Sequence, residues 1–318
     1  MSTQYYYIAK LVFRIDANRI ILDALDARTG HADGVPEHYD VLSVCHEVGR
    51  IDLTDQKFLS QQEPSITEYE YYREIEHLCQ LRYIRATREL IVTFEISKRY
   101  QYNHAEVIAD SIFQFMYLIT LDFGYFPIHA AAVSKRQKAV LVVGESGSGK
   151  STLELALLAH GYSFFADDVV FADDKTQLYN SHESVLAISE KTAGMIFNLF
   201  DFRLVGAVIR TDSLSRKMMY RIDESLREIR QSCQPRILLF PHRGAVNSIR
   251  TITPKQAVSR MIRLFVSMQF SAQQKKGYFD ELTKLATAST CLDFEYDGTS
   301  SDIILEAVSY IDGCLEEA

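Results

Sequence analysis

Residues 144–152 read GESGSGKST, and this stretch decides the fold. It matches the pattern G-x-x-x-x-G-K-[S/T] at every position, with an apolar run at 139–143 before it and an apolar helical segment at 150–160 after it. Glycines let consecutive backbone N–H groups converge on phosphate oxygens, and the start of the following helix adds about half a positive charge. The order strand, loop, helix therefore predicts an α/β domain with a phosphate-binding loop (P-loop) for a nucleoside triphosphate.

The residues of this loop have distinct expected roles. Lys150 can reach the β- and γ-phosphates, and the Ser151 hydroxyl can coordinate Mg²⁺. The alternative is a turn rich in Gly and Ser with a chance lysine, which the flanking strand and helix disfavour. A transporter ATPase and a GTPase are also disfavoured, because the chain has neither an LSGGQ-type signature nor an N-K-x-D motif. The expected nucleotide-binding set is Gly144, Glu145, Ser146, Gly147, Ser148, Gly149, Lys150, Ser151 and Thr152.

An aspartate pair follows the loop at a suggestive distance. Asp168 lies eighteen residues after Lys150, beyond the helix, a glycine turn and an apolar strand at 162–166. We expect that strand to run parallel to the P-loop strand and next to it, so that both carboxylates face the phosphates. Asp167 would then hold Mg²⁺ and Asp168 would accept a proton from an attacking hydroxyl. The alternative is a solvated strand end, where Asp pairs are common.

Three weaker candidates lie outside the loop. His129 stands in a strand of small residues, fifteen positions before Gly144, and can steady either the phosphoryl group or the catalytic Asp; the alternative is a core histidine. Arg243 stands just after the expected strand at 235–240 and can bind a phosphate or a carboxylate. Lys217 can point at nucleotide or substrate. For both cations the alternative is an ordinary surface position.

Residues 129–168 resemble the catalytic domain of HPr kinase/phosphorylase, whose nucleotide fold is similar to that of phosphoenolpyruvate carboxykinase. The family pattern runs from a strand with His-Gly through a GxSGxGKS loop and a helix ending in Arg-Gly-His to a strand ending in Ala-Asp-Asp. The corresponding residues here are His129-Ala130, GESGSGKS from Gly144, His160-Gly161-Tyr162 and Ala166-Asp167-Asp168.

The resemblance implies an ATP- and Mg²⁺-dependent serine kinase. It implies that Asp168 acts as general base on a serine hydroxyl, with Lys150 and His129 supporting phosphoryl transfer. Thr152 stands where the family usually has Glu, and the family's E-I-R-G-L-G segment, which holds a metal-binding Glu, has no clear counterpart; Glu183 and Glu190 are the candidates for that ligand. The pattern is more similar to shortened members, such as accessory kinases of lasso-peptide pathways, which implies a peptide or protein substrate bearing serine.

The rest of the chain suggests two domains. Residues 1–124 are expected to form a β-rich N-terminal domain, closed by a helix from Asn103 to Gly124 in which Glu106 stands at the capping-box position. Residues 125–318 are expected to form the HPr-kinase-like P-loop domain. We expect strands at 128–134, 139–143, 162–166, 169–172, 217–222 and 235–240, and helices at 150–160, 254–268, 273–289 and 301–316. The N-terminal region is a candidate for substrate recognition or for assembly of a homo-oligomer.

Composition sets further bounds. Of 318 residues, 34 are basic and 42 acidic, and a net charge of −8 argues against a nucleic-acid partner. We find no secretory signal and no apolar run long enough to span a membrane, so we expect no membrane partner. The five cysteines are widely spaced, with no C-x-x-C pair. This spacing is typical of reduced thiols in the cytoplasm.

Two other functions remain open on the residues alone. One is a kinase that acts on a hydroxyl of a small molecule, which an enclosed pocket beside Asp168 would favour. The other is a nucleotide-dependent switch or ATPase without a phosphoacceptor, which slow hydrolysis unaffected by any hydroxyl substrate would favour.

Overall fold

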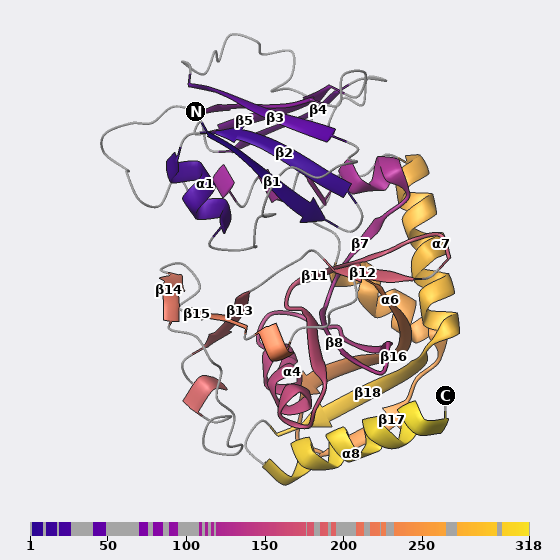
Figure 1. Cartoon of the computed structure of the whole chain (residues 1–318). Helices are drawn as coiled ribbons and strands as arrows, with labels where there is room; N and C mark the ends of the chain where they lie inside the picture. The colour runs from indigo at the N-terminus through magenta and orange to yellow at the C-terminus, as the bar shows by residue number, and fades with distance from the viewer. Residues whose placement is uncertain are drawn as a thin grey trace. The chain divides into compact units, whose positions relative to one another are not determined.

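The computed structural model divides into two compact units. The first is Met1–Phe123 with Gln269–Ser271, and the second is Gly124–Met268 with Ala272–Ala318. Figure 1 draws both units, coloured from the N-terminus to the C-terminus. The structure describes residues 2–8, 11–17, 19–26, 41–48, 70–75, 79–84, 89–94, 108–109, 112–113, 116–117, 119–175, 177–180, 185–189, 192–194, 208–212, 217–222, 224–226, 232–264, 272–297 and 301–317.

The first unit contains a six-stranded mixed sheet in the order β1-β2-β3-β6-β5-β4. Alternate residues of the β1–β2 hairpin, including Tyr6, Phe13 and Ile15, are buried, which is the pattern of a sheet with one face on a core. Helix α1 follows β2, and its Asp26 accepts hydrogen bonds from Tyr6 Oη at 2.8 Å and Gln4 Nε2 at 3.0 Å. The elements are β1 (Ser2–Ile8), β2 (Leu11–Ala17), α1 (Arg19–Asp26), β3 (Val41–Val48), β4 (Glu70–Ile75), β5 (Cys79–Ile84) and β6 (Glu89–Phe94).

Within the predicted helix at 103–124, the described residues from 108 to 120 are α-helical. Its apolar residues Ile108, Ile112, Met116 and Ile119 are buried, and a 3₁₀ turn, η1 (Leu121–Phe123), follows. Gly124 has φ +78°, a left-handed conformation that favours glycine, and it ends the segment. The expected caps Asn103 and Glu106 lie outside the described residues.

The second unit is built on a nine-stranded mixed sheet, so the fold is mixed α/β. β10, β8, β9, β16, β12, β11 and β7 follow one another in space, while β18 pairs with β16 and β17. β9, β16 and β18 are parallel neighbours. The strands are β7 (Phe126–His129), β8 (Ala131–Lys135), β9 (Lys138–Val142), β10 (Ser163–Ala166), β11 (Val169–Ala172), β12 (Leu178–Asn180), β16 (Ser232–Arg243), β17 (Ser248–Thr251) and β18 (Thr290–Tyr296).

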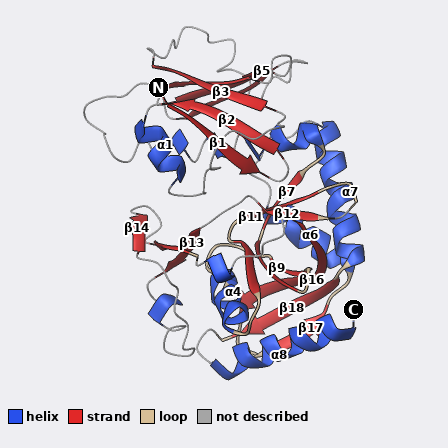
Figure 2. Ribbon diagram, in the orientation of Figure 1, coloured by secondary structure: helices blue, strands red, loops and turns tan. Residues whose placement is uncertain are grey.

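Helices cover both faces of this sheet (Figure 2). Strand register assigns Leu239 and Leu292 to one face, and both belong to the buried cluster that α4 and α8 complete. Phe240 and Asp293 face the other way, toward α6, where the Arg260 guanidinium lies 5.6 Å from the Phe240 ring centroid. The helices are α4 (Lys150–Ala159), α6 (Pro254–Leu264), α7 (Ala272–Ala288) and α8 (Ser301–Glu317).

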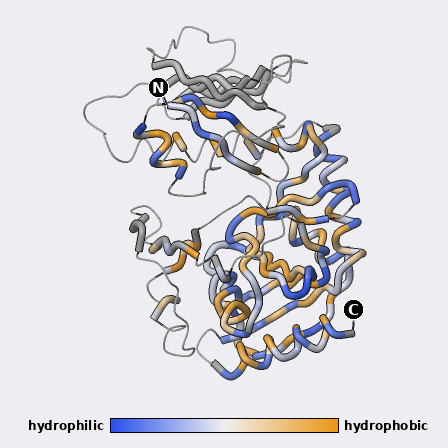
Figure 3. Tube along the Cα trace, in the orientation of Figure 1, coloured by the Kyte–Doolittle hydropathy of each residue, from blue (hydrophilic) through white to orange (hydrophobic). Residues whose placement is uncertain are grey.

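The core lies between the sheet and the α4–α8 layer. Hydrophobic residues dominate α4, whereas α8 alternates between hydrophobic and hydrophilic residues along its length (Figure 3). This agrees with burial, since Leu153 to Leu158 of α4 are all buried, whereas α8 buries one stripe that includes Ile304, Val308 and Ile311. Asp312 fastens α8 to the sheet by accepting hydrogen bonds from Lys135 Nζ and Tyr162 Oη, both at 2.7 Å.

A small sheet in the order β13-β15-β14 packs on the same core. Leu186 and Ile188 of β13 and Tyr220 of β15 are buried within it. The three strands are β13 (Val185–Ser189), β14 (Val208–Asp212) and β15 (Lys217–Arg221), and a 3₁₀ turn, η2 (Glu224–Leu226), follows them.

Two expectations about the strands are wrong. The apolar run 128–134 is not one strand, because it breaks at Ala130 into β7, which pairs with β11, and β8, which pairs with β9. Strand β10 also does not lie next to β9, the strand that precedes the predicted P-loop. A two-residue turn at Arg136 and Gln137, with φ of 54° and 67°, folds β8 directly onto β9, and β16 takes the other side. β10 therefore pairs with β8.

No helix within the described ranges combines the length and the apolar composition that crossing a bilayer requires. Cys233 and Cys291 are buried, Cys314 is half-buried, and none of these three forms a disulfide.

Candidate functional site

The loop between β9 and α4 has the backbone of an anion cradle. Gly147 and Gly149 have φ of +83° and +108°, a region that other residues rarely adopt. The Ser148 N–H donates to the Glu145 carbonyl at 3.2 Å, which closes a tight turn. Gly149 is the N-cap of α4 and supplies no side-chain cap, so the first turn of the helix presents uncapped N–H groups. Uncapped N–H groups at a helix start can donate to an anion.

The side chains of this loop also fit a polyphosphate. Lys150 Nζ donates to the Gly144 carbonyl at 2.6 Å and to the Glu145 carbonyl at 3.2 Å, so its ammonium group lies over the loop. The Ser148 hydroxyl is buried, and none of the described residues gives it a hydrogen bond. A phosphate oxygen would satisfy this hydroxyl and the ammonium group together. Thr152, the third residue of α4, is buried.

His129 and Asp168 form a pair at the junction of β7 and β11. Nδ1 of His129 lies 3.1 Å from Oδ1 of Asp168, and the Ala130 N–H donates to the Asp168 carbonyl at 3.0 Å. His129 is also the register partner of Val169, so backbone pairing fixes the two side chains against each other. The Asp168 side chain is 65% exposed, which leaves its carboxylate accessible to a substrate. His129 is 34% exposed, so it is not a fully enclosed core histidine.

Asp167 points in another direction from Asp168. Its Oδ2 accepts a hydrogen bond from the Ala187 N–H at 2.8 Å, which ties the β10–β11 turn to β13 of the small sheet. The Ala187 N–H therefore lies on the edge of β13 that faces the β10–β11 turn. The two aspartates thus have different tasks in the fold.

Strand register places the loop and the aspartate turn at the same end of the sheet, where β9 and β10 finish. Ala132 of β8 pairs with Leu141 of β9 on one side and with Ala166 of β10 on the other. The predicted P-loop follows the end of β9 at Val142, one residue beyond Leu141, and the aspartates directly follow Ala166. Neighbouring strands lie about 4.8 Å apart, so the two chain segments leave the sheet about 10 Å from each other. A polyphosphate chain is long enough to extend across this separation.

The donor set near the loop suits Mg²⁺ carried by phosphates. The described residues contain no group of three or more His, Cys, Asp or Glu side chains placed to hold a metal ion on their own. Mg²⁺ usually keeps several waters and takes one or two protein oxygens plus substrate phosphates. Ser151, in the first turn of α4, and an Asp167 oxygen are oxygen donors of this kind.

The remaining predicted residues divide between described and undescribed positions. Arg243 ends β16, and its charge and a hydrogen bond from it act on the Tyr296 phenol. The Lys217 backbone lies in β15, paired with Ser189 and Asp212, but its side chain lies outside the described residues. Glu190, like Glu183, also lies outside them.

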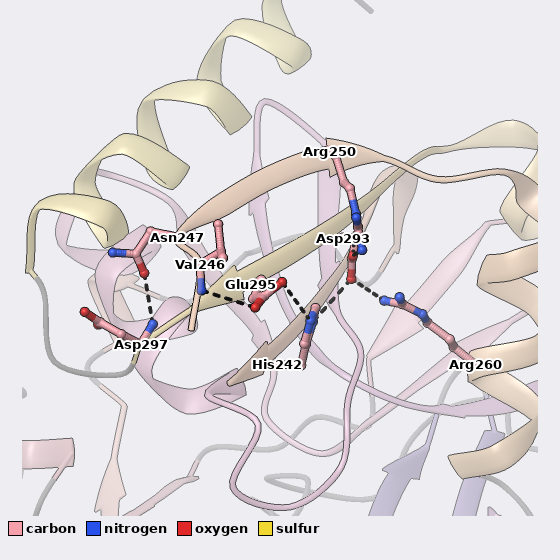
Figure 4. Close-up of polar contacts among 8 residues, drawn as sticks. All are labelled: His242, Val246, Asn247, Arg250, Arg260, Asp293, Glu295 and Asp297. Atoms are coloured by element: carbon pink, nitrogen blue, oxygen red, sulfur yellow. Dashed lines mark hydrogen bonds and ion pairs between the residues drawn. The ribbon is translucent and has the colours of Figure 1, made fainter. Parts of the chain in front are cut away.

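Sequence reasoning missed a polar cluster at the ends of β16 and β18 (Figure 4). Asp293, which is 1% exposed, is the centre: Arg250 Nη2 lies 2.7 Å, Arg260 Nη1 2.5 Å and His242 Nδ1 3.2 Å from its carboxylate. Burial by itself raises the pKa of Asp293, but the hydrogen bonds from Arg260 and Arg250 and the nearby His242 outweigh it, so the pKa lies below its ordinary value. No local motif connects these residues, because they come from four separate elements.

Comparison with known proteins gives little beyond the chain's own geometry. No family model matches the chain, and no curated protein matches it. Among solved structures, the HPr(Ser) kinase/phosphatase from Coxiella burnetii is similar with a TM-score of 0.30 and 11% sequence identity, over 60% of this chain and 91% of that chain.

Proposed function

We propose that this protein is a kinase that uses ATP and Mg²⁺ to phosphorylate a hydroxyl group, with serine of a peptide or protein as the acceptor. One observation carries the proposal. The loop with Lys150 over it and the exposed Asp168–His129 pair lie at the same end of one sheet. The loop and Asp168 follow strands that are two strand spacings apart. A general base and a phosphate cradle at that separation are what phosphoryl transfer to an alcohol requires.

The side chains divide the work of transfer. Asp168 takes the proton of the serine hydroxyl. The serine oxygen forms the new bond to the γ-phosphorus, and the bond from that phosphorus to the bridging oxygen of ADP breaks. His129 Nδ1, 3.1 Å from Oδ1, orients Asp168, whose side chain is 65% exposed and so accessible to a substrate. Lys150 and the N–H groups at the start of α4 neutralise the negative charge that grows on the leaving ADP.

Ser151 and Asp167 are the residues that would hold Mg²⁺. When bound, the ion neutralises charge on the β- and γ-phosphates. The Asp167 oxygen that bonds to Ala187 also keeps this carboxylate oriented. In this arrangement Asp167 supports nucleotide binding and Asp168 supports proton removal.

The test separates nucleotide binding from transfer. We expect Lys150→Ala to abolish ATP binding with an unchanged melting temperature, and the exposed Lys276→Ala on α7 to serve as its matched control. We expect Asp168→Asn to bind ATP normally and lose transfer by about 10²–10⁴-fold, the usual contribution of a general base. Exposed Asp280→Asn on α7 is the control for this change.

The acceptor is identified by incubating the protein with γ-labelled ATP and a panel of serine peptides and small hydroxyl compounds, followed by mass spectrometry. Label on serine of a peptide supports the proposal. Label confined to a small molecule would replace it with a small-molecule kinase, and hydrolysis with no labelled product would replace it with a nucleotide-dependent switch. Equal loss of binding and transfer in Asp168→Asn would assign that residue to metal binding instead.

A further inference from the structure

The phosphate loop rests against Tyr296, the last residue of β18, which is separated from it by about half the chain. Tyr296 Oη donates a hydrogen bond to the Ser148 carbonyl at 3.2 Å, and the tyrosine is 2% exposed. A Cβ built on Gly149 would lie 1.8 Å from Oη and 2.7 Å from Cζ. The phenol therefore touches the loop backbone so closely that only glycine fits between them.

The surrounding strands hold the phenol in this place. The Phe294 ring, two residues earlier on the same strand face, stacks on Tyr296 with centroids 5.2 Å apart and planes 5° from parallel. Arg243 is the register partner of Tyr296 on β16 and hydrogen-bonds to its phenol. Burial raises the pKa of Tyr296, and the charge and hydrogen bond of Arg243 offset only part of this rise. Tyr296 therefore remains a neutral hydrogen-bond donor.

The turn beyond Arg243 is fixed as well (Figure 4). The Val246 N–H donates to Glu295 Oε1 at 3.3 Å, and the Asp297 N–H donates to Asn247 Oδ1 at 2.9 Å. Gly244 donates its N–H to the Tyr296 carbonyl at 3.1 Å. A Cβ on Gly244 would lie 1.9 Å from Glu295 Oε1, so the turn is packed directly on β18. Both backbone and side chain of Tyr296 are held.

We propose that Tyr296 is a positioning residue for the phosphate loop, acting through the peptide unit that joins Ser148 to Gly149. In a trans peptide the C=O and N–H groups point in opposite directions. By holding the Ser148 carbonyl, the Tyr296 hydroxyl turns the Gly149 N–H away from β18. That amide thus becomes a preset donor for a phosphate oxygen. This inference rests on the proposed function, because it assumes that the loop binds polyphosphate.

The decisive variant is Tyr296→Phe, which removes the hydroxyl and keeps the ring against Phe294 and Gly149. A net hydrogen bond contributes about 0.5–1.5 kcal/mol, so we expect ATP·Mg²⁺ affinity to fall about 2- to 12-fold. Affinity for Mg²⁺-tripolyphosphate should fall by the same factor, because the change acts on the phosphate cradle. We expect the KM for ATP to rise by this factor while the KM for the acceptor is unchanged.

Tyr162→Phe is the matched control. Tyr162 is also buried, and its hydroxyl donates to Asp312 of α8 rather than to the loop. We expect this variant to lower the melting temperature and to leave both affinities unchanged. A readout of stability thus separates a structural tyrosine from a positioning one.

The outcomes are distinguishable from those of the kinase proposal. Wild-type affinity in Tyr296→Phe overturns the positioning role and leaves the kinase proposal standing. A loss for ATP that spares tripolyphosphate also overturns it, because the hydroxyl would then act outside the phosphate cradle. Absence of ATP binding in the wild-type protein overturns both proposals, and binding that survives Lys150→Ala overturns the loop assignment on which both depend.

Discussion

At the residue scale, replacing His129 distinguishes a role in phosphoryl transfer from a role in the core. Its side chain is one-third exposed and its nearest charged partner is Asp168, so removing it leaves little buried volume empty. We expect His129→Ala to lower the rate of transfer by less than the 10²–10⁴-fold of losing the base itself, with a melting temperature within a few degrees of wild type. Stopped assays for kcat and thermal denaturation measure the two effects.

A double variant decides whether His129 acts through Asp168. If it does, the losses of His129→Ala and Asp168→Asn are not additive, because removing the base removes what the histidine orients. A large fall in melting temperature with unchanged kcat would make His129 a core residue instead.

The candidate site was predictable at this scale wherever residues are close in sequence. The loop, the lysine and the aspartate pair all lie within 144–168, and their spacing carried the signal. Tyr296 gave no such signal, since its contact with Ser148 joins residues 148 positions apart. Nothing local distinguishes Tyr296 from the other tyrosines of the chain. Its role depends on β18 being a parallel neighbour of β16, which only the folded sheet shows.

At the scale of elements, helix α7 contains a buried acid that links its packing to pH. Glu281 is 1% exposed, and its Oε2 lies 3.1 Å from Lys284 Nζ, while Oε1 has no hydrogen-bond partner in the described part of the chain. Burial raises its pKa above the ordinary 4.5, and Lys284 lowers it only in part. The unfolded chain therefore releases this proton at lower pH than the folded protein does.

The sign of the pH effect follows from that order. As pH rises above 4.5, the unfolded state binds fewer protons at this position than the folded state, so Glu281 makes the fold less stable until its folded pKa is passed. We expect the difference in free energy of unfolding between Glu281→Gln and wild type, measured by urea denaturation, to shift in favour of the variant as pH rises from 4 to 8. Lys284→Met should steepen the wild-type pH dependence, and a difference that is constant across pH would contradict the assignment.

Helices were easier to predict than strand neighbours. The apolar periods at 150–160, 273–289 and 301–316 correspond to α4, α7 and α8 within a residue or two. Periodicity depends on residues three or four apart, so it is visible locally. Which strands pair depends on competition for each sheet edge. The turn at Arg136 and Gln137 closes β8 onto β9, and β16 pairs with the other side of β9, so β10 pairs with β8 instead.

At the scale of the whole molecule, Cys291 offers a probe of opening in the second unit. It lies in β18, is 2% exposed, and burial raises its pKa to about 11. Only the thiolate reacts with an alkylating reagent, so Cys291 should be labelled near neutral pH only when β18 is released from the sheet. Half-buried Cys314, on the terminal helix α8, is the internal reference.

The last prediction joins this probe to the proposed nucleotide site. A ligand that binds only the folded state at 100 times its Kd stabilises it by about 2.7 kcal/mol, which lowers the open population about 100-fold. We expect ATP·Mg²⁺ at that concentration to slow labelling of Cys291 by about this factor, measured by peptide mass spectrometry, while labelling of Cys314 changes far less. Lys150→Ala should remove the protection. Rapid labelling of Cys291 without nucleotide would show that β18 opens independently, and unchanged labelling with nucleotide would show that the loop does not bind it.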